Sequence, residues 1–185
     1  LWFNIGTSYG AKKINEATAC RTVEGKLKKL GFNTAQCPAS SWREVVLAKL
    51  DELAKLYNVD YFKLDFSSIA SPYGIMGYGC YANDHEHHQG FEDSILRQYQ
   101  SFRYLRDELK NKHPKLIVDF SFEAFGTAAP NIAALGYSEL HHVSNLSGNK
   151  TEVQDITQIR KNFYRWSRLL PPERQLLGLL TLQNE

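Results

Sequence analysis

The sequence has few cysteines, little net charge and no long apolar run, and each absence excludes a class of protein. The only cysteines are Cys20, Cys37 and Cys80, with no CxxC pair and no ligand-like spacing, so neither a disulfide framework nor a zinc site is predicted. No apolar run approaches the roughly 18 residues of a membrane span. The formal net charge is +2 and the lysines are spread along the chain, so neither nucleic acid nor a membrane surface is an expected partner.

What remains is an ordinary globular composition. The 185 residues are 43% hydrophobic and 23% charged, which is enough for one domain with a sizeable core. The chain begins without Met in the run Leu1-Trp-Phe-Asn-Ile5 and ends in the apolar run of residues 179–182, and both ends have the character of strands inside a domain. We therefore expect residues 1–185 to be a part of one domain, with the rest of the parent polypeptide as a partner.

Apolar periodicity predicts strands that alternate with helices. The predicted strands are 1–7, 61–66, 116–122, 139–144 and 175–182, with a brief extended piece at 33–37. The predicted helices are 22–30, 41–57, 91–110 and 152–170, with a weak helix at 131–135. Ser41 and Glu44 have the spacing of a capping box, and Val23, Leu27 and Leu30 would share one face of the first helix. This alternation favours a mostly parallel sheet.

Two α/β architectures fit a parallel sheet, a doubly wound open sheet and a (β/α)8 TIM barrel. No GxGxxG motif follows the first predicted strand, as a dinucleotide-binding open sheet would require. Polar residues stand at or near the ends of several predicted strands: Asp65, Ser121, Glu123, Asn145 and Asn184. Because barrel enzymes take their catalytic groups from several strand ends, the pattern favours the barrel. A full barrel needs about 250 residues, so we expect an incomplete portion of one.

The predicted strand that contains Lys63 and Asp65 has two distinct faces. Side chains alternate along a strand, so Lys63 and Asp65 share one face while Phe62, Leu64 and Phe66 share the other. Burying two charges is costly unless they pair or meet a ligand. The pair is therefore either a structural ion pair or a part of a catalytic site, and the strand alone leaves both possibilities open.

The connection after this strand, residues 67–90, is long for a compact domain, and loops of this length usually carry function. It contains His85, His87 and His88. Their spacing does not place three imidazoles on one helix face, and no second carboxylate-rich motif follows at ligand spacing. We therefore predict an exposed or substrate-facing loop, no metal and no cofactor.

Several stretches resemble one enzyme family. The run Cys37-Pro-Ala-Ser-Ser41, followed by the run from Asp51 to Asp65, is similar to the approach to the nucleophile strand of glycoside hydrolase family 36, the alpha-galactosidases or melibiases. The run of residues 103–119 is similar to the next helix and strand of that family, and Leu1-Trp-Phe resembles an earlier strand. The resemblance implies a TIM-barrel catalytic domain, of which this chain would supply roughly the third to the seventh strand.

The resemblance assigns roles to individual residues. Asp65 takes the place of the nucleophile and Lys63 that of a lysine that contacts the sugar, while Asn145 stands where the family has its acid/base aspartate. An amide cannot donate a proton as a carboxylic acid does, so Glu123 or Glu139 would have to assist the leaving group. Further candidates for substrate binding are Asp119 and Ser121, with Glu123 and with Trp2, whose ring is either core or a platform for a sugar.

Three functions follow as hypotheses. The first is a retaining glycosidase with a carbohydrate substrate, an alpha-linked galactoside or a related sugar, in carbohydrate metabolism. The second is a non-catalytic or altered homologue that binds carbohydrate on the same barrel face. The third is a barrel enzyme that uses Lys63 as a Schiff-base amine. The first is the function that the resemblance favours.

Overall fold

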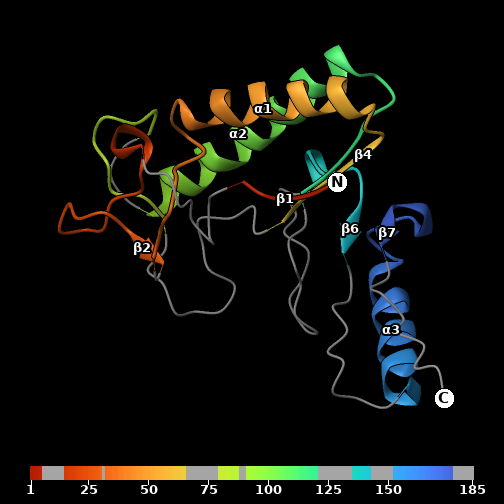
Figure 1. Cartoon of the computed structure of the whole chain (residues 1–185). Helices are drawn as coiled ribbons and strands as arrows, with labels where there is room; N and C mark the ends of the chain where they lie inside the picture. Colours follow the sequence, from red (N-terminus) through yellow and green to blue (C-terminus); the bar gives the residue numbers. More distant parts are fainter. Residues whose placement is uncertain are drawn as a thin grey trace.

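A small parallel sheet organises the N-terminal two thirds of the structure. The computed structural model describes residues 1–5, 15–30, 32–65, 79–87, 91–120, 135–142 and 152–176. Strands β1 (Trp2–Asn4), β4 (Tyr61–Asp65) and β5 (Ile117–Asp119) are parallel, with β4 between the other two. The parallel strands predicted in these three stretches are confirmed, and β4 is the central strand, as Figure 1 shows.

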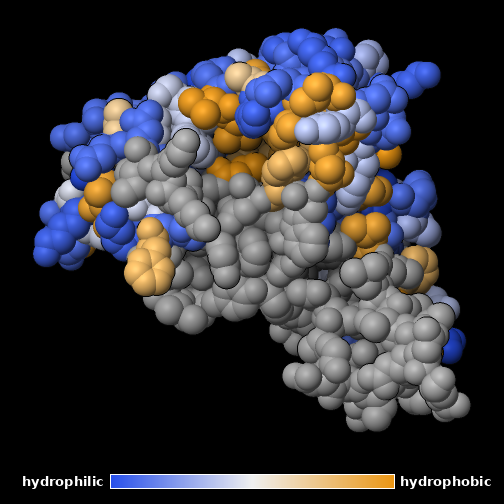
Figure 2. Space-filling model, in the orientation of Figure 1, coloured by the Kyte–Doolittle hydropathy of each residue, from blue (hydrophilic) through white to orange (hydrophobic). Residues whose placement is uncertain are grey.

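Two long helices, α1 (Trp42–Tyr57) and α2 (Phe91–Lys112), lie side by side and pack on one face of this sheet (Figure 1). Phe62 and Leu64 of β4 are fully buried in the core between helices and sheet, as the two-residue period predicted. The core continues through apolar side chains of both helices and of β5: Val46, Leu47, Leu50, Phe102, Leu105, Leu109 and Val118. Figure 2 shows the corresponding hydropathy, with hydrophilic residues on the outer surface of the helices and hydrophobic ones toward the sheet.

The start of α1 differs from the predicted capping box. Ser41 has helical dihedral angles and makes no capping hydrogen bond with its side chain. Ser40 caps the helix instead. Its hydroxyl oxygen accepts from the Trp42 N–H at 3.2 Å, and its O–H donates to the Cys37 carbonyl at 2.6 Å. The cap prediction was therefore displaced by one residue, since a local bond back to Cys37 orients Ser40 toward the helix. At the other end the predicted stop at Asn58 is confirmed, in a left-handed conformation with φ 49°.

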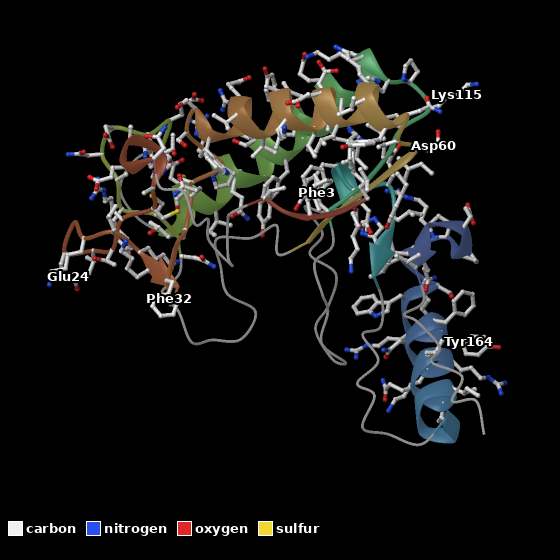
Figure 3. All side chains as sticks on the ribbon, viewed as in Figure 1. Phe3, Glu24, Phe32, Asp60, Lys115 and Tyr164 are labelled. Atoms are coloured by element: carbon white, nitrogen blue, oxygen red, sulfur yellow. The ribbon has the colours of Figure 1, made fainter. Side chains whose placement is uncertain are left out.

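The helix predicted for residues 22–30 is wrong. The chain forms a turn there, with Arg21 bridged to Leu27, and continues into the antiparallel pair β2 (Lys29–Leu30) and β3 (Asn33–Thr34). Gly25 has φ +77°, which other residues rarely adopt, so the turn suits this glycine better than a helix does. Figure 3 shows Glu24 and Phe32 at the outer tips of this segment. A short 3-10 helix, η1 (Glu16–Thr18), precedes it.

The C-terminal elements form a second parallel pair. Strands β6 (His141–His142) and β7 (Gln175–Leu176) pair in parallel, connected through α3 (Glu152–Trp166) and the 3-10 helix η3 (Pro172–Arg174). The segment before β6 runs beside β5, because the Glu139 N–H donates to the Val118 carbonyl at 3.2 Å. The predictions of strand, helix and strand in this region are thus confirmed for the described residues.

The fold is a mixed α/β arrangement in which helices follow parallel strands. Within the described ranges the strands form one sheet of three and two sheets of two, and they do not close into a barrel. The weak helix predicted at 131–135 lies almost wholly outside the described residues. None of the helices in the described part of the chain has the length and apolarity to cross a membrane.

Candidate functional site

The first candidate site lies along the face of β4 opposite the core. Lys63 is in register with Asp119 of β5, and with Trp2 of β1 on the other side. Asp65, the last residue of β4, is in register with Asn4. Residues in register on neighbouring parallel strands share a face, so Lys63 and Asp119 belong to one polar row while Phe62 points into the core.

Asp119 is a completely buried carboxylate that accepts a hydrogen bond from the hydroxyl of Tyr61. The Tyr61 O–H donates to Asp119 Oδ2 at 2.8 Å. Ser138 Oγ lies 3.4 Å from Asp119 Oδ1, but it donates its proton to the Leu140 carbonyl at 2.6 Å and accepts from the Phe120 N–H at 3.1 Å. Burial and the neighbouring Asp119 charge both raise the pKa of Tyr61, so its phenol remains a donor at neutral pH. The row of polar groups is thus held in place by hydrogen bonds between β4, β5 and the segment before β6.

The two ends of β4 differ in chemistry. Asp60 and Lys115 lie at the N-terminal ends of β4 and β5 (Figure 3), with the Asp60 carbonyl accepting from the Ile117 N–H at 2.9 Å. Asp65 closes the opposite, C-terminal end. In parallel α/β folds ligands bind at the C-terminal ends of strands. Asp65 therefore occupies the end of the strand where a catalytic group is expected.

Glu139, one of the two alternative acids, has a different environment from the one expected of a proton donor. Its Oε2 accepts from the Val118 N–H at 2.7 Å, and its Oε1 lies 3.0 Å from the Lys110 ammonium near the end of α2. The Glu139 carboxylate therefore satisfies a backbone N–H of β5 and forms an ion pair with a lysine of α2. Of the other predicted site residues, Ser121, Glu123 and Asn145 lie outside the described residues.

A second cluster joins residues that no sequence motif connected. Cys37, Cys80, His85 and His87 each offer one sulfur or nitrogen atom, and these four atoms lie within 4.8 Å of one another. Both cysteines are completely buried, and His87 is 7% exposed. Cys20 is also completely buried and packs in the same cluster.

Two short contacts order the cluster. The Cys37 sulfur lies 3.5 Å from His87 Nε2, and the Cys80 sulfur lies 3.5 Å from His85 Nδ1. The other ring nitrogen of His85, Nε2, lies 3.1 Å from the Ala17 carbonyl oxygen and donates its proton there. That bond leaves Nδ1 as the nitrogen with a free lone pair facing sulfur.

The thiols of the cluster differ in pKa. Hydrogen bonds to Cys37 and Cys80, together with burial, raise the pKa of Cys20, so it remains a thiol. The pKa of Cys37 is also raised, whereas hydrogen bonding to Cys20 and then to Cys37 lowers the pKa of Cys80. The side chain of Lys28 lies beside these sulfurs, with its ammonium 3.5 Å from the Gly79 carbonyl.

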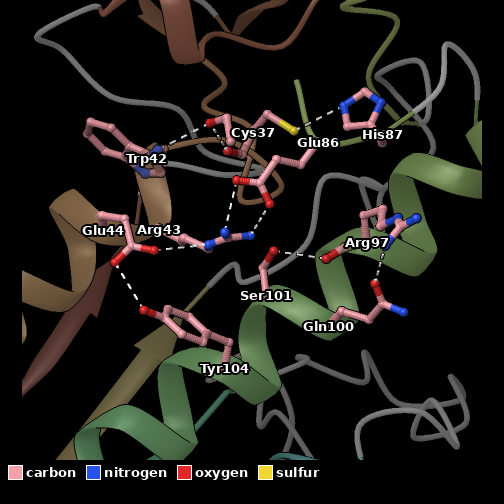
Figure 4. Close-up of polar contacts among 11 residues, drawn as sticks. Cys37, Trp42, Arg43, Glu44, Glu86, His87, Arg97, Gln100, Ser101 and Tyr104 are labelled. Carbon is pink, nitrogen blue, oxygen red and sulfur yellow. Dashed lines mark hydrogen bonds and ion pairs between the residues drawn. The ribbon is translucent and has the colours of Figure 1, made fainter. Parts of the chain in front are cut away.

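Figure 4 shows His87 beside Cys37, together with the contacts of the neighbouring Glu86. The Glu86 N–H donates to the Ala39 carbonyl at 3.0 Å, so residues 85–87 run beside residues 37–39. The Glu86 carboxylate pairs with the Arg43 guanidinium at 2.7 Å, and Arg43 lies over the Tyr104 ring at 5.2 Å. A small cavity of about 140 Å³ between α1 and α2 is lined by this ion pair.

In the sequence, no motif connects the histidines of the loop with the three cysteines, so a shared site was not predicted. The structure brings Cys37, from the segment before α1, onto Cys80, His85 and His87 of the connection after β4, whereas His88 lies outside the described residues. The available signal was the presence of three cysteines and a histidine-rich loop in one chain. It was not decisive, because ligands on distant segments have no fixed spacing.

Comparison with known proteins gives a likeness in fold. The chain matches no family model and no curated protein. Among solved structures, it is similar to a variant of the alpha-galactosidase AgaA of Geobacillus stearothermophilus, a member of glycoside hydrolase family 36, in complex with 1-deoxygalactonojirimycin. The TM-score is 0.57 at 12% identity, over 94% of this chain and 22% of that chain. The chain thus spans about a fifth of the length of that enzyme and shares its fold over that part.

Proposed function

We propose that this chain is part of the catalytic barrel of a retaining glycoside hydrolase that acts on alpha-linked galactosides or a related sugar. The observation that carries the proposal is the position of Asp65, at the C-terminal end of the central parallel strand of a fold similar to that of an alpha-galactosidase. The sequence resemblance around residues 37–66 points independently to the same residue as the nucleophile.

The order of the strands supports the barrel. In the parallel sheet β1, β4 and β5 lie in the order in which the chain forms them, with the separate β2–β3 pair inserted between β1 and β4; the segment before β6 lies along β5, and β6 pairs with β7. Among these described parallel strands the order does not reverse, whereas the strand order of a doubly wound sheet reverses at the point where its ligand binds. A succession of parallel strands in chain order is typical of a (β/α)8 barrel, and residues 1–185 would form a portion of it.

In the proposed mechanism Asp65 attacks the anomeric carbon and forms a glycosyl-enzyme intermediate, which water then hydrolyses. Lys63 lies beside Asp119 on the polar face of β4, where the Lys63 ammonium would bind sugar hydroxyls, while the completely buried Asp119 would support this face from within. Tyr61 holds Asp119 in position through its hydroxyl. Because this hydrogen bond joins β4 to β5 within the folded chain, the polar row is ordered before any substrate binds.

The general acid is the open part of the mechanism. Asn145 stands at the family's acid position in the sequence but cannot donate a proton to a leaving group. Glu139 is engaged by Lys110 and the Val118 N–H, so we assign the role to Glu123 in preference to Glu139. General acid catalysis contributes about 10²–10⁴-fold and matters most for basic leaving groups.

The proposal is tested with the full parent protein and a panel of aryl glycosides. We expect hydrolysis of an aryl alpha-galactoside by the wild type, and a loss of at least about 10³-fold in Asp65→Asn, because the nucleophile is gone. Asp60→Asn is the matched control, since Asp60 is exposed at the opposite end of the same strand. Sugar binding without turnover of any glycoside would favour the altered carbohydrate-binding homologue instead.

A further inference from the structure

We propose that Cys37, Cys80, His85 and His87 bind one Zn²⁺ ion in a closed tetrahedral site that ties the connection after β4 to the segment before α1. The four candidate ligand atoms lie within 4.8 Å of one another in a buried cluster. Nothing in the proposed glycosidase mechanism uses these residues, so the metal site is a separate property of the chain.

The distances agree with zinc. With Zn–S of about 2.3 Å and Zn–N of about 2.0–2.1 Å, tetrahedral geometry separates a sulfur and a nitrogen ligand by about 3.5 Å. Cys37 Sγ and His87 Nε2 are 3.5 Å apart, and so are Cys80 Sγ and His85 Nδ1. Two sulfurs and two imidazole nitrogens are a frequent ligand set of structural zinc sites.

Groups around the ligands have the arrangement that metal sites require. The Ala17 carbonyl accepts from His85 Nε2 at 3.1 Å, which fixes the tautomer that presents Nδ1 to the metal. Cys20 and Ala39 pack against Cys37 and Cys80 in the same buried cluster, so the ligand sulfurs lie in a closed, preformed place.

The position of the cluster defines what the ion would do. Cys37 precedes α1, whereas Cys80 to His87 belong to the connection that begins after Asp65 and leads into α2. The ion would therefore cross-link two loops that are distant in sequence. Four protein ligands leave no open coordination position, so the role is structural rather than catalytic. Anchored in this way, residues 80–87 of the connection would be held against the segment before α1.

Metal content of the purified protein is the first test. We expect about one equivalent of zinc per chain in protein prepared without added metal, as measured by inductively coupled plasma mass spectrometry. Replacement of the zinc by Co²⁺ should produce the intense visible absorption of a tetrahedral cobalt site together with a thiolate charge-transfer band. X-ray absorption of the zinc protein should fit two sulfur and two nitrogen ligands at the distances given above.

Variants then identify the ligands. Cys37→Ser and His87→Asn should each retain less than about a tenth of an equivalent of zinc after dialysis against a weak chelator, whereas His113→Asn, at a partly buried histidine outside the cluster, should retain the full equivalent. Because a ligand variant can also fail to fold, the cobalt and X-ray absorption spectra of the wild type stand as independent measurements.

Four results would overturn the inference. These are wild-type protein without bound metal, a disulfide between Cys37 and Cys80, a spectrum of another ligand set, and zinc retained in full by both ligand variants. None of these readouts depends on sugar hydrolysis. Failure of the metal site and failure of the glycosidase proposal are therefore distinguishable.

Discussion

Replacement of Tyr61 by phenylalanine removes the hydroxyl that donates to the buried carboxylate of Asp119. The bond is 2.8 Å long and its acceptor is completely buried, so water cannot replace the lost donor. A hydrogen bond to a charged group contributes about 1.5–3 kcal/mol to stability. Because Ser138 also lies near this carboxylate, we expect Tyr61→Phe to lower the free energy of unfolding by about 1.5–2 kcal/mol.

Urea denaturation followed by circular dichroism measures this change. The double-mutant cycle with Asp119→Asn should show a coupling energy of at least about 1 kcal/mol, since each replacement removes the same charged bond. Tyr57→Phe is the matched control, because Tyr57 is 64% exposed at the end of α1 and should change stability by less than about 0.5 kcal/mol. A loss in Tyr61→Phe no larger than that of the control, or no coupling, would refute the role of Tyr61 in holding Asp119.

Three other predictions concern stability. Leu64→Ala should cost about 2–5 kcal/mol in denaturation experiments, because Leu64 is completely buried, whereas Leu56→Ala, at a 65% exposed position, should cost less than about 0.5 kcal/mol. Burial, and then the charge of Arg174, lower the pKa of His141 to about 4. As the pH falls below about 6.5, His141 is protonated in the unfolded chain before it is protonated in the folded one. The free energy of unfolding should therefore drop by up to about 2 kcal/mol between about pH 6.5 and pH 4. His141→Gln should remove this pH dependence. Hydrogen bonds from Lys55 first, and then from His113 and Lys112, lower the pKa of Asp51 to about 2. The stability that the ionised Asp51 contributes is therefore present above its unfolded pKa and is lost as the pH falls through about 2. Asp51→Asn should cost less than about 1 kcal/mol at neutral pH, because Asp51 lies near the surface.

The elements that the sequence predicted correctly are those whose pattern repeats over many residues. β4 and the helices α1 and α2 each bury one face, so the spacing of their apolar residues reveals the type of element without knowledge of its neighbours. The helix at residues 22–30 failed because three apolar residues at helical spacing also fit a turn and a short strand pair. There Gly25 favoured the turn, and Val23 is 69% exposed.

The candidate sites depend on contacts between distant segments, and this limits what a sequence can predict. The alternation of β4 was sufficient to place Phe62 and Leu64 in the core and Lys63 on the opposite face. It could not indicate that Tyr61 would position Asp119, nor that Glu139 would be engaged by Lys110. The cysteine and histidine cluster was missed for the same reason, since its ligands meet only when the chain folds.

The measurement that tests the central claim most directly is covalent trapping of the nucleophile. A fluorinated galactosyl fluoride forms the glycosyl-enzyme intermediate of a retaining enzyme and slows its breakdown, so the labelled residue can be found by peptide mass spectrometry. The account predicts one sugar residue on Asp65, no label in Asp65→Asn and full label in Asp60→Asn. A label on another carboxylate, or no label together with no hydrolysis of any glycoside, would contradict the claim that Asp65 is the nucleophile of a retaining glycosidase.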